Sequence, residues 1–195
     1  DGATGGPELF RAAVDELTVV VESMPGRSVR EVAVDIEPFV AAGRLLYDGA
    51  FVAERYAAVG GFVSAGVGTF DPTVRAIIEG SAHLPAWRYA EDLTRLRRLG
   101  SVIGPIWDEI DVLVVPSAPR IPTVDEVAAD PVGVNTMLGT YTNFVNLLDL
   151  AAVTVPVWGV AGTLGHDRVA QPPPSLTLVG PAWSEAMLVS LAARL

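Results

Sequence analysis

Short apolar runs recur along this chain between longer stretches with helical spacing, and this alternation restricts the folds that it can adopt. Val112 to Val115 is wholly apolar and is closed by Pro116. Such a run is typical of a strand covered on both faces, as in parallel or mixed sheets. Ala152 to Val157 and Ser175 to Val179 predict two more buried strands, and Val32 to Ile36 alternates like a strand. Strands that alternate with helices indicate an α/β fold with helices packed on a sheet.

Helices are predicted from apolar spacing and from the residues that start and stop helices. Asp71 and Pro72 form an N-cap followed by a proline in the first turn, and Ser184 caps a final helix. A long helix from Ala86 is expected to bend or break near Gly104 and Pro105. The first predicted helix starts at Pro7 and is broken at 24–26. The other predicted helices span 38–62, a segment starting at 71–72, 86–110, 136–149 and 184–195, and 116–131 is predicted to be a proline-rich loop.

Composition limits the classes of function. The 195 residues suit one domain or a large part of one, and a mean hydropathy of +0.41 favours a core shared with further sequence. A net charge of -10 argues against a nucleic-acid or anionic-membrane surface, because both need clustered cations. The chain contains neither cysteine nor lysine. We expect no signal peptide, no transmembrane helix and a cytoplasmic location.

Tyr47 and Arg55 are the first candidate site. They lie eight residues apart in one predicted helix, separated by about two turns plus roughly 80° at 3.6 residues per turn, so both can reach one cleft. A guanidinium offers a planar fork that matches a carboxylate, and a tyrosine hydroxyl adds a directional hydrogen bond. The pair suits a small anionic substrate. The alternative is a surface arginine near Glu54 and a half-buried core tyrosine.

Ser117 lies in the loop after a predicted buried strand, which is where α/β proteins place ligands. No lysine exists to activate it as a nucleophile, and neither His83 nor His166 has a sequence context that marks a base or a metal ligand. A simple strand exit is therefore the favoured interpretation of Ser117. No metal site is predicted.

Three other sets of residues have simple structural interpretations. The glycines of 59–69 do not match a phosphate-binding pattern. Asn143 and Asn146 are interpreted as helix amides that tie a neighbouring loop, with ligand binding as the alternative. Four arginines with Glu91 and Asp92 beside them indicate a solvated helix face. The four are Arg88, Arg95, Arg97 and Arg98.

The stretch Leu138 to Leu150, LGTYTNFVNLLDL, combines small, amide and apolar residues. It resembles the late helix of the amidase-signature enzymes, in the version found in allophanate hydrolases. The segment from Tyr47 to Arg55 shares the resemblance, which continues through 71–80, 111–116, 138–156 and 178–184. The resemblance implies an amidase-signature-type mixed β-sheet covered by helices on both faces. It also implies that residues 1–195 are the C-terminal part of an amidase domain.

An activity follows from the same resemblance. Family members use a lysine, a cis-serine and a nucleophilic serine that lie upstream of the matched region, so no catalytic residue is assigned in this chain. Tyr47 and Arg55 match the residues with which allophanate hydrolases hold the substrate and its carboxylate. The implied reaction is hydrolysis of urea-1-carboxylate (allophanate) to ammonia and carbon dioxide without a cofactor. The implied partners are the N-terminal half of the same domain and a biotin-dependent urea carboxylase.

The chain departs from the family pattern where Gln171 to Ser175 replaces a glycine before the last strand. We expect no accessory C-terminal domain of the kind found in many allophanate hydrolases. The chain alone is expected to be inactive, because it lacks the lysine and the two serines of the family. An incomplete sheet has open edges, so the chain alone is also expected to be poorly soluble or to self-associate, and a homodimer stays open. Two other interpretations also stay open. One is another amidase or an amidotransferase subunit that acts on a neutral amide, which needs no Arg55. The other is a non-catalytic module that binds a small carboxylate or a protein.

Overall fold

The computed structural model describes residues 6–66, 68–158 and 174–195, and the chain divides into two compact units. The first unit consists of Asp1–Asp35, Pro105–Ile121 and Asp149–Leu195. The second consists of Ile36–Gly104 and Pro122–Leu148. The described strands all belong to the first unit, and the described part of the second is helical. Each unit is therefore built from segments that are far apart in the sequence.

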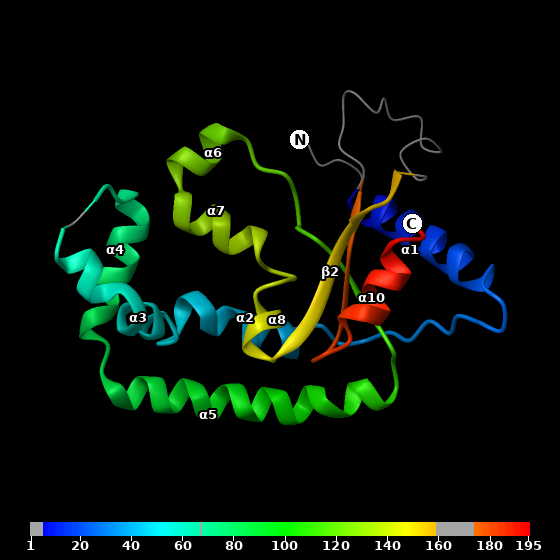
Figure 1. Ribbon diagram of the computed structural model, residues 1–195, viewed down its shortest axis with the longest axis horizontal. Helices are drawn as coiled ribbons and strands as arrows, with labels where there is room; N and C mark the ends of the chain where they lie inside the picture. Colours follow the sequence, from blue (N-terminus) through cyan, green and yellow to red (C-terminus); the bar gives the residue numbers. More distant parts are fainter. Residues whose placement is uncertain (1–5, 67, 159–173) are drawn as a thin grey trace. The chain divides into compact units, whose positions relative to one another are not determined.

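Three strands form the sheet of the first unit, and they lie where the sequence predicts them. β1 (Leu113–Pro116) and β2 (Leu150–Pro156) both pair antiparallel with β3 (Ser175–Pro181), in the order β1-β3-β2 (Figure 1). The α/β class is confirmed, and the pairing among the described strands is antiparallel throughout. β3 is the most buried of the three, as its central place in this order requires.

β2 is not buried on both faces, so that part of the prediction is wrong. Its burial alternates: Ala151 is buried, whereas Ala152 and Thr154 are exposed. The reason is that α10 packs on the face of β2 that carries Ala151, and alternate side chains of a strand point to opposite faces. One row of small and polar side chains on β2 therefore faces away from this core.

Two helices cover one face of the sheet. α1 (Gly6–Glu22) and α10 (Glu185–Ala192) share a core with β2 and β3, and Leu178 and Leu188 are completely buried in it. The sequence predicts α1 from apolar spacing, which places residues three and four apart on one face, and α10 from Ser184 at its start. The buried members of this core are Ala13, Leu17, Ala151, Val157, Leu176, Leu178 and Leu188.

The strand predicted at Val32 to Ile36 is wrong. The structure has no strand there. Side-chain contacts hold the two residues just before it: Arg11 binds Glu31 at 2.6 Å, and Nη2 of Arg30 donates to the carbonyl of Glu109 at 3.0 Å. Alternation of apolar and polar residues indicates a strand only where a neighbouring strand completes the backbone hydrogen bonds, and none of the three described strands pairs with this segment.

The second unit is a set of helices in which the pairs α2–α5, α2–α8, α3–α4 and α6–α7 are in contact. Its best buried aromatic contact joins Phe39 of α2 to Phe144 of α8, with ring centroids 5.2 Å apart in an edge-to-face arrangement. The helices are α2 (Glu37–Asp48), α3 (Val52–Ser64), α4 (Pro72–Gly80), α5 (Ala86–Ile103), α6 (Val124–Ala129), α7 (Pro131–Leu138) and α8 (Phe144–Leu147).

The single helix predicted for 38–62 is wrong, because the chain turns a corner between α2 and α3. Gly49 has extended backbone angles, φ -94° and ψ -176°. The N–H of Ala50 donates to Oδ2 of Asp92 on α5 at 2.7 Å, which replaces a helical bond. Ala50 is fully buried and Phe51 nearly so. Three residues thus separate two helices that apolar spacing alone would join.

Local capping residues change two other boundaries. Thr123 and Glu126 form a reciprocal capping box that starts α6 inside the predicted loop 116–131. Asp130 accepts from the N–H of Gly133 and starts α7, which ends at Leu138. The helix predicted for 136–149 is therefore wrong as a continuous helix, because Gly139 starts a turn before α8.

Two other predicted helix boundaries are confirmed, but the predicted cap at Ser184 is wrong, because its hydroxyl donates to the carbonyl of Pro181 and does not cap α10. The Asp71 carboxylate accepts from the N–H groups of Thr73 and Val74 at the start of α4. α5 ends at Ile103, followed by the 3₁₀ turn Gly104–Asp108 at the predicted break. In the part of the chain that the structure describes, no helix is long and apolar enough to span a membrane.

Candidate functional site

Tyr47 and Arg55 are in contact, although they belong to two helices rather than to the one helix that the sequence predicts. Cζ of Arg55 lies 5.5 Å from the centroid of the Tyr47 ring. This is within the range of a cation–π interaction, which is worth about 0.5–1 kcal/mol at exposed sites. Both side chains are half-buried. The corner between α2 and α3 brings together the two residues that the sequence singled out.

Arg55 keeps its donors free. Within the described residues, its guanidinium has neither an ion-pair nor a hydrogen-bond partner, and the Tyr47 ring is its one recorded contact. Some other arginines are paired, such as Arg75 with Glu79 at 2.8 Å and Arg44 with Glu37 at 2.9 Å, whereas the exposed Arg97 has no side-chain partner in the described chain. A half-buried guanidinium held by a ring but not by a carboxylate is suited to bind an external anion.

The first turns of α5 hold the corner. Asp92 accepts from the N–H of Ala50, and the Tyr89 ring packs edge-to-face against Phe51 with centroids 5.5 Å apart. Nη2 of Arg88 makes a long contact of 3.4 Å with the carbonyl of Asp48, the last residue of α2. A cation is favourable there, because the C-terminus of a helix carries partial negative charge. The corner is thus fixed by side chains about forty residues away in sequence.

Gly49 is required at this corner by space. A Cβ at this position would lie 2.6 Å from the carbonyl oxygen of Leu45 and 3.0 Å from Oδ2 of Asp92. Both contacts are closer than real Cβ atoms tolerate comfortably. The approach of Asp92 to the backbone therefore depends on a residue without a side chain.

Sequence reasoning missed the contribution of α5. It assigned Asp92 to a solvated helix face, whereas the Asp92 carboxylate binds a buried backbone segment. It also gave no role to Tyr89, whose hydroxyl donates to Oε1 of Glu54 at 2.6 Å. That hydrogen bond, followed by burial and the Glu54 charge, raises the pKa of Tyr89 above its usual value. The one local sign of the corner in the sequence is Gly49, which interrupts the helical spacing between α2 and α3.

Ser117 lies in a chain of hydroxyl groups across the sheet. Its Oγ is 3.0 Å from Oγ1 of the buried Thr177, which in turn lies 2.8 Å from Oγ1 of Thr154. The strand register explains this contact, because Thr154 and Thr177 are directly opposite one another. The recorded partners of Ser117 are hydroxyl and backbone groups, so the strand-exit interpretation is favoured and no base adjoins the hydroxyl in the described chain.

The remaining polar candidates do not assemble into a site. Asn143 packs on Gly43 and Gly139, where a Cβ would collide with it, so this side chain fills the space between α2 and α8. Asn146 is exposed, and His83 is exposed in a short 3₁₀ turn. His166 lies outside the described residues. No group of three or more His, Asp or Glu side chains within 6–66, 68–158 and 174–195 is arranged to hold a metal ion.

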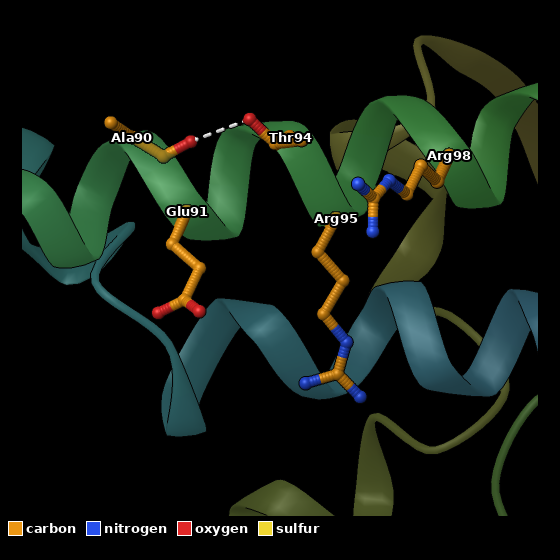
Figure 2. Close-up of a pocket in the computed structure, with 5 residues that line it drawn as sticks. All are labelled: Ala90, Glu91, Thr94, Arg95 and Arg98. Atoms are coloured by element: carbon orange, nitrogen blue, oxygen red, sulfur yellow. Dashed lines mark hydrogen bonds between the residues drawn. The ribbon is translucent and has the colours of Figure 1, made fainter.

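The arginines of α5 border a shallow, open hollow on the helix surface. Figure 2 shows Glu91 and Arg95 extending to the same side of α5, with Arg98 one turn further along. Thr94 is bonded to the carbonyl of Ala90 within the helix. The five lining residues come from one helix and all are exposed, so the solvated-face interpretation holds for Arg95 and Arg98.

Known proteins resemble nearly the whole chain. Urea amidolyase of Lachancea kluyveri is 40% identical over 198 residues, which cover 99% of this chain and 10% of that protein. The structure of Kluyveromyces lactis allophanate hydrolase superposes with a TM-score of 0.80 at 36% identity, over 99% of this chain and 29% of that one. The structure of 6-aminohexanoate cyclic dimer hydrolase has a TM-score of 0.61 at 15% identity, over 95% of this chain and 40% of that one, which shows a shared fold alone.

The chain thus spans about a tenth of the length of the curated urea amidolyases that it matches. A scan against protein-family models finds no match. The similarity in sequence and fold extends over the helices that carry Tyr47 and Arg55 as well as over the sheet, since it covers 99% of the chain. The chain is homologous to the allophanate hydrolase portion of urea amidolyase, which supports its resemblance to the amidase-signature enzymes.

Proposed function

We propose that this chain is the C-terminal part of an amidase domain and that it supplies the residues that bind the substrate's carboxylate. The observation that carries the proposal is the Arg55 guanidinium, held against the Tyr47 ring with no partner in the described chain. Its planar fork matches a carboxylate bidentately, and the Tyr47 hydroxyl adds a directional hydrogen bond. A neutral amide substrate would not require a half-buried cation.

The complete protein would then hydrolyse urea-1-carboxylate to ammonia and carbon dioxide. In this proposal the lysine and the two serines that form and break the acyl-enzyme lie in the rest of the amidase domain, since this chain has no lysine. The chain by itself is inactive. A biotin-dependent urea carboxylase is the enzyme that would supply urea-1-carboxylate, and both would work in the cytoplasm.

The test is ammonia release from urea-1-carboxylate by the complete protein that carries this segment. We expect activity in the parent protein and a strong rise of KM in the Arg55→Gln variant, because the substrate carboxylate loses its fork. Arg97→Gln is the matched control, since Arg97 lies on the exposed face of α5 and has no recorded side-chain partner in the described chain. Equal KM values for the two variants would overturn the role of Arg55.

A second candidate function rests on the absence of lysine from all 195 residues. The chain would then be a non-catalytic module that binds a small carboxylate. Malonate is a suitable probe, because it presents a carboxylate on a small flexible backbone. Binding of malonate by the complete protein without ammonia release from urea-1-carboxylate would favour this function, whereas turnover would exclude it.

A further inference from the structure

The carboxylate of Glu54, the residue before Arg55, accepts a hydrogen bond from a tyrosine hydroxyl. Glu54 lies in the first turn of α3, and its Oε1 accepts a hydrogen bond of 2.6 Å from the Tyr89 hydroxyl on α5. The Tyr89 ring is itself fixed by its edge-to-face contact with Phe51. A tyrosine hydroxyl is protonated, and therefore a donor, at neutral pH, and the raised pKa of Tyr89 only extends this to higher pH. Glu54 is thus directed toward α5.

A free carboxylate at this place would compete with the substrate. Glu54 is exposed and has a flexible side chain, so without a partner it can approach the guanidinium of its neighbour. Acidic residues four positions away pair with arginines elsewhere in this chain, as in Arg11–Asp15 and Arg75–Glu79. Glu54 is the immediate neighbour of Arg55 and does not face it on the helix, so its effect on the guanidinium is mainly that of a nearby negative charge. Even where no ion pair forms, a negative charge beside Arg55 repels an incoming carboxylate.

We infer that Tyr89 is a positioning residue of the carboxylate site: its hydroxyl holds Glu54 away from Arg55, so that the guanidinium stays free for an anionic substrate. This inference rests on the proposed function, because it concerns the same site. The hydrogen bond from Tyr89 keeps the negative charge of Glu54 from competing with the substrate's carboxylate for Arg55. This gives α5 a role in the site that neither Tyr47 nor Arg55 can perform. Asp92 contributes by fixing the corner that sets the distance between α3 and Tyr89.

The experiment measures the Kd of malonate by calorimetry on the complete protein and its variants. Tyr89→Phe keeps the ring contact with Phe51 and removes the hydroxyl, so Glu54 is released. We expect the Kd of malonate to rise about three- to fivefold, the range that an exposed charge pair provides. In the double variant Glu54→Gln with Tyr89→Phe the competing charge is gone, and the Kd returns to the parent value. Glu54→Gln alone binds malonate at least as tightly as the parent.

Tyr56→Phe is the matched control, because the Tyr56 hydroxyl has no recorded partner in the described chain. Its Kd is expected to equal that of the parent. A Kd unchanged in Tyr89→Phe, a double variant as weak as Tyr89→Phe, or weaker binding by Glu54→Gln alone would each overturn the inference. The Arg55→Gln variant distinguishes the positioning role of Tyr89 from the proposed function. If Arg55→Gln loses malonate binding and Tyr89→Phe has no effect, the positioning role is overturned and the proposed function stands.

Discussion

Arg55 of α3 lies with its Cζ 5.5 Å from the ring centroid of Tyr47 of α2, across a three-residue corner. The contact has a different origin from the one that the sequence indicates. Residues eight apart on one continuous helix are about 12 Å apart along its axis at a rise of 1.5 Å per residue. The two side chains meet across the corner instead, so the geometry of the candidate site depends on the contacts that hold the corner.

The corner itself can be tested at Gly49. Gly49→Ala places a Cβ 2.6 Å from the Leu45 carbonyl oxygen and 3.0 Å from Oδ2 of Asp92. We expect the free energy of unfolding to fall by about 1–3 kcal/mol, the usual cost of overpacking. Gly61→Ala in α3 is the control, because its Cβ meets nothing within 4 Å and alanine is the better helix former. Denaturant unfolding in which both variants are equally stable would refute the close approach at Gly49.

Asp92 is expected to contribute more to the free energy of unfolding than its neighbour Glu91. Asp92→Ala removes the acceptor of the buried Ala50 N–H, and a hydrogen bond to a charged group contributes about 1.5–3 kcal/mol. Asp92→Asn keeps an acceptor oxygen and is expected to lose less. Glu91→Ala, one residue away on the exposed face, is expected to be close to neutral. Thermal unfolding distinguishes them, and similar losses for Asp92→Ala and Glu91→Ala would show that the contact contributes nothing.

The contact of Tyr89 with Glu54 gives a pH dependence with a defined sign. The folded-state pKa of Tyr89 is raised, so the protonated phenol is the form that folding favours. This stabilisation is fully present below the unfolded pKa of 10.0 and is lost as the pH rises through the higher folded value. The stability difference between the parent and Tyr89→Phe is therefore expected to shrink above that pH in thermal melts. A difference that grew with pH would contradict the assignment.

The hydroxyl chain across the sheet predicts a structural role without a catalytic one. Thr177→Val removes the central hydroxyl from a fully buried position between Ser117 and Thr154, and each lost hydrogen bond is worth about 0.5–1.5 kcal/mol. Ser117→Ala is expected to leave the kcat for ammonia release unchanged in the complete protein. A large loss of kcat in Ser117→Ala would make that residue a candidate nucleophile again.

The sequence predicts well those elements whose signals are local. Asp71 and Pro72 start α4 as their residue types indicate, because an N-cap acts within three residues of itself. The apolar runs at β1 and β3 are strands because burial on a sheet selects continuous apolar residues. Tyr47 and Arg55 do come together, although the single helix from which the sequence predicts this is wrong, and their role in binding stays a prediction.

The sequence fails where a distant residue decides the local structure. Asp92 interrupts the helix at Ala50 from 42 residues away, and nothing in a single sequence links the two positions. Val32 to Ile36 fails for the opposite reason. The alternating pattern of a strand is present in the sequence, but none of the described strands pairs with this segment. Tyr89 is overlooked for the same reason as Asp92: its role is visible only when α5 lies beside α3.

The most direct test of the central claim is the KM of the complete protein for urea-1-carboxylate in the Arg55→Lys variant. Lysine keeps the positive charge but replaces a bidentate fork with a point charge. If Arg55 binds the substrate's carboxylate, KM rises by about tenfold or more, since a lost charge-assisted hydrogen bond costs about 1.5–3 kcal/mol. An unchanged KM, measured beside an unchanged Arg97→Lys control, would contradict the account.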